Sequence, residues 1–340
     1  GYYTTTQANG DPNTLAPQNP LASLELRDDR SNVNRFLGSA QFDYRFRALP
    51  DLRANLNLAA DLSESQGQVS VPSYAVMNWD RNGDDPAYGG VDAIYKQKKR
   101  NELLDFYLNY AKDLVGINSK LDVMAGYSWQ HFWRAGNYVE VNESRTDTRT
   151  NTDYATESYL VSFFGRMNYS LADKYLLTLT VRNDGSSRFA PENRWGLFPS
   201  AAFAWKINEE SFLKNVDAVS DLKLRIGYGV TGQQNITSGD YPYLARYTFS
   251  EPTARYMFGN HLITTLRPEG YDANLKWEET TTLNIGLDYG FFNDRIIGAF
   301  EYYSRETKDL INTIPVPAGT NLTNQILTNV GNLTNEGVEF

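Results

Sequence analysis

The chain lacks cysteine, has only two histidines and carries no excess of positive charge, and each of these features removes a class of protein. Its 340 residues include no cysteine, which excludes a disulfide framework and a thiolate metal site. Its net charge of −9 argues against nucleic acid as a partner, because phosphate recognition needs a basic surface. The two histidines, His131 and His261, accompany no motif typical of a nucleophile. We therefore predict no catalytic residues, no enzyme activity and no cofactor.

Long hydrophobic runs are absent as well. No stretch of about 18 apolar residues occurs, so no membrane-spanning helix is expected. This does not exclude a membrane barrel, because only every second residue of a barrel strand has to contact lipid. The chain start, from Gly1, shows neither the charged region nor the apolar core of a signal peptide.

What the chain does contain is a two-residue alternation that recurs from end to end. Phe36, Gly38, Ala40 and Phe42, for example, alternate with mostly polar residues. Successive side chains of a strand point to opposite faces, so such a segment has one apolar and one wet face. The segments are about 10 residues long, the length with which a tilted strand crosses a bilayer. The predicted strands cover 35–48, 52–62, 102–112, 119–130, 159–169, 174–182, 195–207, 221–230, 278–289 and 295–307, with another starting at Val338 and a short helix within 208–220.

Short and long connections alternate between these strands. Short turns are expected near 49–51, 112–118, 170–173 and 290–294, and long loops at 63–101, 131–157, 183–194 and 231–276. Short periplasmic turns and long extracellular loops are typical of outer-membrane barrels, as are aromatic residues at strand ends. We therefore predict an all-β fold, an antiparallel transmembrane β-barrel.

The alternation also predicts which side chains face lipid. The predicted lipid-facing residues are Leu56, Phe106, Val123, Phe163, Leu179, Leu224, Leu283, Ile285 and Leu287. The charged residues predicted to face the wet interior are Arg45, Arg47, Arg53, Arg166, Arg182, Lys223, Arg225, Asp288, Glu301 and Arg305.

Two motifs favour a structural interpretation over a binding one. Residues 227–232 spell G-x-G-x-x-G, but a loop follows where a dinucleotide site needs a helix. Glycines at a strand end instead suit a close approach of the backbone. Residues 80–85 begin like a calcium loop, yet Asp85 replaces the glycine and Val91 the glutamate that such a loop requires. A solvated turn is the better interpretation, and no metal site is predicted.

Four stretches together resemble the SusC/RagA family of TonB-dependent outer-membrane transporters from Bacteroidetes. These are 182–189 with 194–200, 222–234, the segment from Trp277-Glu278 to Asp288, and 329–340. The resemblance covers the whole chain and implies a barrel of about 22 strands, of which roughly half are supplied here. Residues 1–340 are accordingly expected to be part of the barrel domain, with the plug domain and the Ton box not present in this chain.

The resemblance also implies a function. It implies energised import of a bulky nutrient, such as an oligosaccharide or peptide, across the outer membrane of a Gram-negative bacterium. The implied partners are a SusD-like surface lipoprotein, outer-membrane lipid, and the TonB complex, reached through the missing N-terminal part. A siderophore receptor, a passive porin, and a soluble secreted β-rich binding or adhesion protein remain as alternatives.

The long loop predicted at 63–101 is the candidate ligand site. Flat aromatic rings beside carboxylates and amides suit stacking on a sugar and hydrogen bonding to its hydroxyls. The candidate substrate-binding residues are Trp79, Asp80, Asn82, Asp84 and Tyr88. The alternative is a loop that only packs against the lipoprotein.

Overall fold

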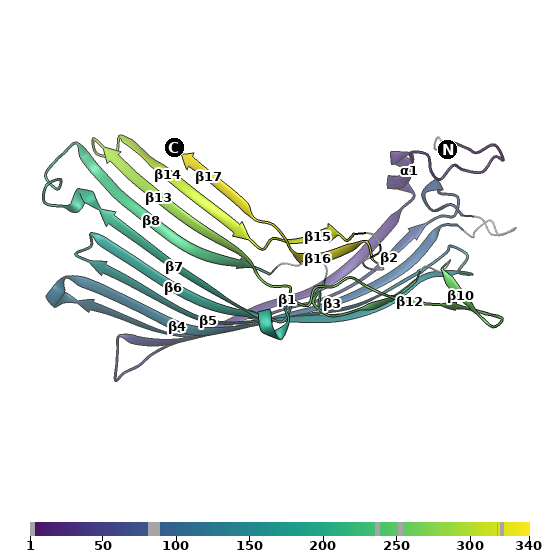
Figure 1. The fold of residues 1–340 in the computed structure, drawn as a ribbon, viewed down its shortest axis with the longest axis horizontal. Helices are drawn as coiled ribbons and strands as arrows, with labels where there is room; N and C mark the ends of the chain where they lie inside the picture. The colour runs from purple at the N-terminus through teal and green to yellow at the C-terminus, as the bar shows by residue number, and fades with distance from the viewer. Residues whose placement is uncertain (1–3, 81–88, 235–238, 251–253, 318, 320–322) are drawn as a thin grey trace. The chain divides into compact units, whose positions relative to one another are not determined.

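The fold is dominated by one eleven-stranded sheet with the order β1-β2-β3-β4-β5-β6-β7-β8-β13-β14-β17 (Figure 1). The structure is a computed structural model that describes residues 4–80, 89–234, 239–250, 254–317, 319 and 323–340. The strands of the sheet are β1 (Asp28–Arg45), β2 (Leu52–Val71), β3 (Val91–Leu114), β4 (Ser119–Val141), β5 (Thr148–Leu171), β6 (Tyr175–Ser186), β7 (Trp195–Lys206), β8 (Val219–Gln233), β13 (Glu278–Phe291), β14 (Ile296–Lys308) and β17 (Leu333–Glu339). The ten strands predicted with both ends are therefore confirmed, whereas the strand expected to start at Val338 begins earlier, at Leu333, and ends at Glu339.

The chain divides into two compact units. The first contains 1–39, 59–102 and 131–157, and the second contains 40–58, 103–130 and 158–340. The first unit has a small core of Val69, Val71, Ala75, Val91 and Ala93. The second has a core of Phe189, Phe198, Leu275 and Trp277.

Smaller elements occupy the connections. They are α1 (Pro20–Glu25), the 3-10 turns η1 (Val76–Asn78), η2 (Val115–Ile117), η3 (Pro191–Asn193) and η4 (Ile207–Glu209), and the short strands β9 (Tyr247–Phe249), β10 (Arg255–Phe258), β11 (His261–Thr264), β12 (Leu266–Pro268), β15 (Ile311–Pro315) and β16 (Gln325–Asn329). The helix expected within 208–220 is wrong, because only η4 forms there, followed by turns. In the part of the chain that the structure describes, no helix has the length and apolarity needed to cross a membrane.

Several strands are longer than the alternation of apolar residues predicted. Residues 63–71 belong to β2 and 91–101 to β3, so the connection between these strands is 72–90 rather than 63–101. The predicted loop at 131–157 is likewise mostly strand, since β4 continues to Val141 and β5 begins at Thr148. The physical reason is that the small residues Ser65 and Gly67 continue the two-residue rhythm towards buried Val69 and Val71.

The register of the second unit separates the two faces of the sheet. One continuous row of directly paired residues is entirely apolar or aromatic: Tyr169, Leu177, Phe203, Ile226, Ile285, Tyr302 and Val338. The adjacent row, on the opposite face, is polar or small apart from Tyr303: Asn168, Thr178, Ala202, Gly227, Asn284, Tyr303 and Gly337. Directly opposite residues share a face and neighbours in sequence do not, so each strand carries both surfaces.

The predicted facing follows this division. Six of the residues predicted to face lipid lie on the apolar face: Phe163, Leu179, Leu224, Leu283, Ile285 and Leu287. Val123 joins them, because Tyr127 on the same face of β4 packs at 5.4 Å from Phe163. Seven of the charged residues predicted to face the interior lie on the opposite, polar face: Arg166, Arg182, Lys223, Arg225, Asp288, Glu301 and Arg305. The facing of Leu56, Arg45, Arg47 and Arg53 stays a prediction.

Candidate functional site

Charged side chains on the polar face of the second unit form a network. Arg225 holds Asp288 with two parallel hydrogen bonds, Nε to Oδ2 at 2.9 Å and Nη2 to Oδ1 at 2.8 Å. Lys223 Nζ lies 2.7 Å from the Asp288 Oδ2, and Arg225 also pairs with Glu301. The bidentate geometry is the strongest form of such a pair. These side chains lie on strands β8, β13 and β14, so the network extends across three strands.

A second group lies on the same polar face. Arg182 Nε donates to the two oxygens of Asp184 at 2.7 and 2.9 Å, while its Nη2 donates to Ser162 Oγ at 2.7 Å. Ser128 Oγ donates to Asp105 Oδ1 at 2.5 Å. Among the residues described, no three His, Cys, Asp or Glu side chains gather in a way that could hold a metal ion. The face therefore carries paired charged and polar side chains.

Aromatic residues of two of the motifs that carry the family resemblance, 182–200 and the segment from Trp277, form a core rather than a binding surface. Phe189 and Leu275 are fully buried, and Trp277 packs on Phe189 and Phe198 with ring centroids 5.2 and 5.3 Å apart. The Trp277 indole donates to the Arg194 carbonyl at 2.9 Å, which satisfies its one polar group. These residues hold the ends of β6, β7 and β13 together.

The G-x-G-x-x-G run has a packing role in this core. A Cβ at Gly232 would lie 2.1 Å from the Phe198 ring, closer than any real contact. A Cβ at Gly196 of β7 would lie 2.4 Å from the same ring. The interpretation as a site of close approach is confirmed for Gly232, whereas a Cβ at Gly227 would meet nothing within 4 Å. Strand β8 continues through the motif.

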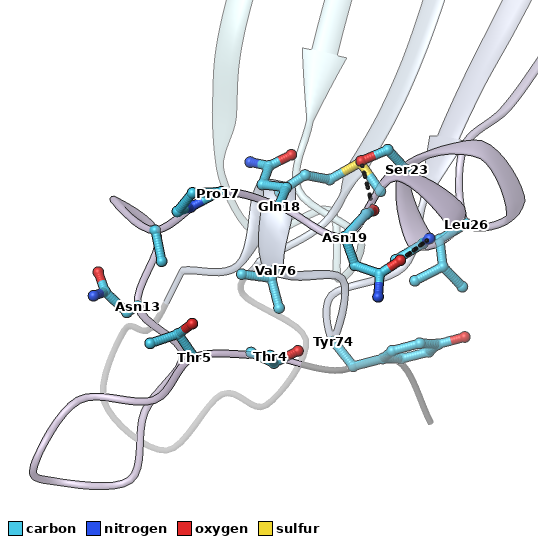
Figure 2. Close-up of a pocket in the computed structure, with 13 residues that line it drawn as sticks. Thr4, Thr5, Asn13, Pro17, Gln18, Asn19, Ser23, Leu26, Tyr74 and Val76 are labelled. Atoms are coloured by element: carbon cyan, nitrogen blue, oxygen red, sulfur yellow. Dashed lines mark hydrogen bonds between the residues drawn. The ribbon is translucent and has the colours of Figure 1, made fainter.

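A pocket of about 270 Å³ lies beside α1 in the first unit (Figure 2). Asn19 caps this helix, its Oδ1 accepting from the Leu21 and Ala22 amides at 3.0 and 3.3 Å. All 13 lining residues that the structure describes are uncharged, and they include Thr4, Thr5, Asn13, Gln18, Asn19 and Ser23 beside Pro17, Leu26, Tyr74, Val76 and Met77. Hydroxyl and amide groups next to apolar surface suit an uncharged polar ligand.

The predicted ligand residues are only partly placed. Trp79 is half-buried at the end of η1 and Asp80 is exposed, and neither lines the pocket. Asn82, Asp84 and Tyr88, together with most of the calcium-like run, lie outside the described residues. The pocket residues were missed from sequence because 4–26 and 74–77 come together only in the fold. The Asn19-Pro20 pair, an N-cap followed by a first-turn proline, was the available signal.

Comparison with known proteins agrees with this two-faced sheet. The model of the TonB dependent receptor-like β-barrel family matches residues 1–340. The chain belongs to the TonB-dependent receptor β-barrel family. TonB-dependent receptor SusC of Bacteroides thetaiotaomicron is 45% identical over 335 residues, which are 96% of this chain and 32% of SusC. TonB-dependent receptor P26 of Formosa agariphila is 32% identical over 95% of this chain and 32% of its own length.

The same fold occurs in a solved relative. The structure of the RagAB peptide transporter matches with a TM-score of 0.78 at 21% identity, over 97% of this chain and 37% of that chain. This TonB-dependent receptor barrel thus spans about a third of the length of the relatives it matches. Family membership places it in the outer membrane of a Gram-negative bacterium and excludes the soluble secreted alternative. The apolar face of the sheet is therefore its lipid-facing surface, and the polar face is its inner surface.

Proposed function

We propose that this barrel takes part in TonB-dependent import of bulky nutrients, oligosaccharides or peptides, across the outer membrane. The observation that carries the proposal is the 45% identity to SusC over 96% of the chain. The charge-balanced polar face supports it, because Arg225 with Asp288 and Arg182 with Asp184 suit a wet barrel interior. The peptide class comes from the name of the solved relative, the RagAB peptide transporter, and the oligosaccharide class from the resemblance of the motifs to the SusC/RagA family.

Two partners belong to this proposal. A SusD-like surface lipoprotein would cover the extracellular end, and the TonB complex would supply energy. The family match supports the energy source, since it is to TonB-dependent receptors. Residues on the loop 72–90, with Trp79, Asp80, Asn82, Asp84 and Tyr88, remain our proposed nutrient contact. The neighbouring pocket beside α1 suits an uncharged hydroxyl-bearing group, which favours sugars over charged peptide ends.

The test is uptake by the intact cell. The gene that encodes this barrel is deleted in its native host, and uptake of labelled oligosaccharides and peptides of graded length is measured. We expect the loss of one substrate class, restored by the complete gene but not when TonB is disabled. Uptake that persists without TonB would indicate a passive porin. Loss of ferric siderophore uptake alone would indicate a siderophore receptor. Either result would overturn the proposal.

A further inference from the structure

The pocket beside α1 lies between two segments of the first unit that are far apart in the chain (Figure 2). The first is the segment before β1, in which residues 5–13 form a small hairpin and the Asn13 amide donates to the Thr5 carbonyl at 2.7 Å. The second is the connection that contains η1, where the Ser73 amide donates to the Glu143 carboxylate at 2.8 Å. Contacts within the unit therefore hold both walls, and the pocket is formed without a ligand.

The floor of the pocket is apolar and its edge is polar. Leu26 and Met77 line the pocket and also pack against the small core of the unit, so the floor belongs to the folded interior. Thr5 and Gln18, which also line the pocket, are exposed and carry a hydroxyl and an amide group. Small-molecule sites combine an apolar lining with a few placed polar groups in this way. A sugar ring has the matching division, because its C–H groups form an apolar face and its hydroxyls project from the edge.

Asn19 presents a fixed hydrogen-bond donor to this pocket. Its Oδ1 accepts from the Leu21 and Ala22 amides at 3.0 and 3.3 Å, and this cap sets the orientation of the side-chain amide. In Figure 2 the Nδ2 atom points away from these bonds, towards the side of the pocket on which Tyr74 lies. Within the described residues no hydrogen bond uses Asn19 Nδ2 or the Gln18 side chain. Neutral donors are thus left for a ligand.

The size and the charge of the pocket select the ligand. Its volume of about 270 Å³ is slightly below the range of about 300–1,000 Å³ that is usual for small-molecule sites, so it holds one ring and not a chain of several units. No lining residue that the structure describes carries a charge. A carboxylate or an ammonium group would lose water on entering and find no partner of opposite charge, which is unfavourable. The pocket therefore suits a neutral, hydroxyl-rich ring and selects against a uronate or a peptide terminus.

We propose that the pocket beside α1 binds one neutral hexose unit of an oligosaccharide, with Asn19 Nδ2 donating to a ring hydroxyl and the apolar floor contacting the C–H face. The inference rests on the proposed import of nutrients for its biological role. It deepens that proposal by naming an uncharged glycan as the substrate and by placing one recognition site on segments 4–26 and 74–77. This site is separate from the contact proposed for Trp79 and Asp80, neither of which lines the pocket.

The test measures ligand binding to the complete transporter by saturation-transfer NMR in an amine-oxide detergent, because glycoside detergents carry sugar headgroups of their own. The probes are glucose, galactose, mannose and fructose, with glucuronate and galacturonate as charged counterparts and N-acetylglycine amide as a neutral peptide unit. In N19D the aspartate keeps the cap but replaces the Nδ2 donor, and in A22M a longer side chain fills the pocket. Q7E adds the same charge as N19D at an exposed residue of the same segment that does not line the pocket.

Wild type should bind at least one of the neutral hexoses and neither uronate. Loss of the donor should lower the affinity of N19D for that hexose by about 3- to 10-fold, because one hydrogen bond is removed. A22M should show no saturation transfer, and Q7E should bind like wild type. Heat-modifiable migration on gels checks that each variant is folded.

The proposal is overturned if wild type binds no neutral hexose, or if it binds the uronates or the peptide unit equally well. Unchanged binding in N19D or in A22M would place the sugar elsewhere on the transporter and overturn it too. An equal loss in Q7E would assign the effect to added charge rather than to the lost donor, with the same consequence. The uptake test is independent of these results, because the deleted gene and the disabled TonB decide it, so a pocket that binds no sugar leaves the proposed import untouched.

Discussion

Replacing Leu179 by arginine puts a charge into the apolar face of the sheet near the middle of β6. Leu179 is 40% exposed, and the residues directly opposite it are Met167 and Ala201, neither of which offers a polar partner. Arginine on the lipid face of a barrel costs about 2–4 kcal/mol at mid-depth. At about 1.36 kcal/mol per factor of ten, the folded population relative to the unfolded one falls about 30- to 900-fold.

The matched change is Thr178→Arg, one residue earlier and on the opposite face. Thr178 faces Asn168 and Ala202, so the new charge meets no like charge directly opposite. The loss is the hydrogen bond from Thr178 Oγ1 to Asn168 Oδ1, at 2.9 Å, which is worth about 0.5–1.5 kcal/mol. The wet interior hydrates the guanidinium, so Thr178→Arg should cost less than Leu179→Arg.

The assay is denaturant-dependent folding of the complete transporter into lipid vesicles, followed by tryptophan fluorescence. Midpoints and slopes yield the free energy of unfolding for each variant. Leu179→Ala serves as the control that removes packing without adding charge. Equal losses for the arginine variants at 178 and 179 would show that β6 is buried or hydrated on both faces, and the assignment of one face to lipid would be refuted.

Three further predictions follow from the structure. Phe189→Ala, which empties a fully buried site, should lower the free energy of unfolding by about 3–5 kcal/mol in the same assay, and a cost below about 1 kcal/mol would show that this core does not hold the strand ends. When Arg145 or Ala172 of this cysteine-free chain is replaced by cysteine, an impermeant maleimide added to intact cells should label position 145 and not position 172. Labelling at 172 and not at 145 would show that the predicted topology is inverted. In the complete transporter, Trp79→Ala combined with Tyr88→Ala should slow growth on the native nutrient while barrel assembly and lipoprotein binding persist; unchanged growth, or loss of lipoprotein binding alone, would remove the loop from the nutrient path.

The facing of the strands was predictable because it is a local property. Residues two apart in any extended segment share a face, so the pattern that includes Leu224 and Ile226 needed no tertiary information. Strand ends were harder to predict. Ser65 and Gly67 continue the rhythm without an apolar signal, and the extension of β2 appears only when Val69 and Val71 meet Ala93 in the small core.

The family resemblance identified the motifs in the sequence but did not reveal the packing role of their residues. Trp277 is far in the chain from Phe189 and Phe198, and no local rule states that its ring contacts both of theirs. Packing decided their role, and with it the need for glycine at 232. The charge pairs also depend on tertiary structure, because Arg225 contacts Asp288 only through the register of β8 against β13.

The sequence by itself therefore determined the class of the protein: strands long enough to cross a membrane, a lipid face, a wet face and alternating short and long connections. The tertiary structure alone decided the contacts between distant segments. The α1 pocket, the aromatic core and the placement of Arg100 over Trp133 all join residues from separate strands or loops. Periodicity reports the direction of a side chain relative to its own strand, whereas the partner it meets depends on strand register, which only long-range pairing sets.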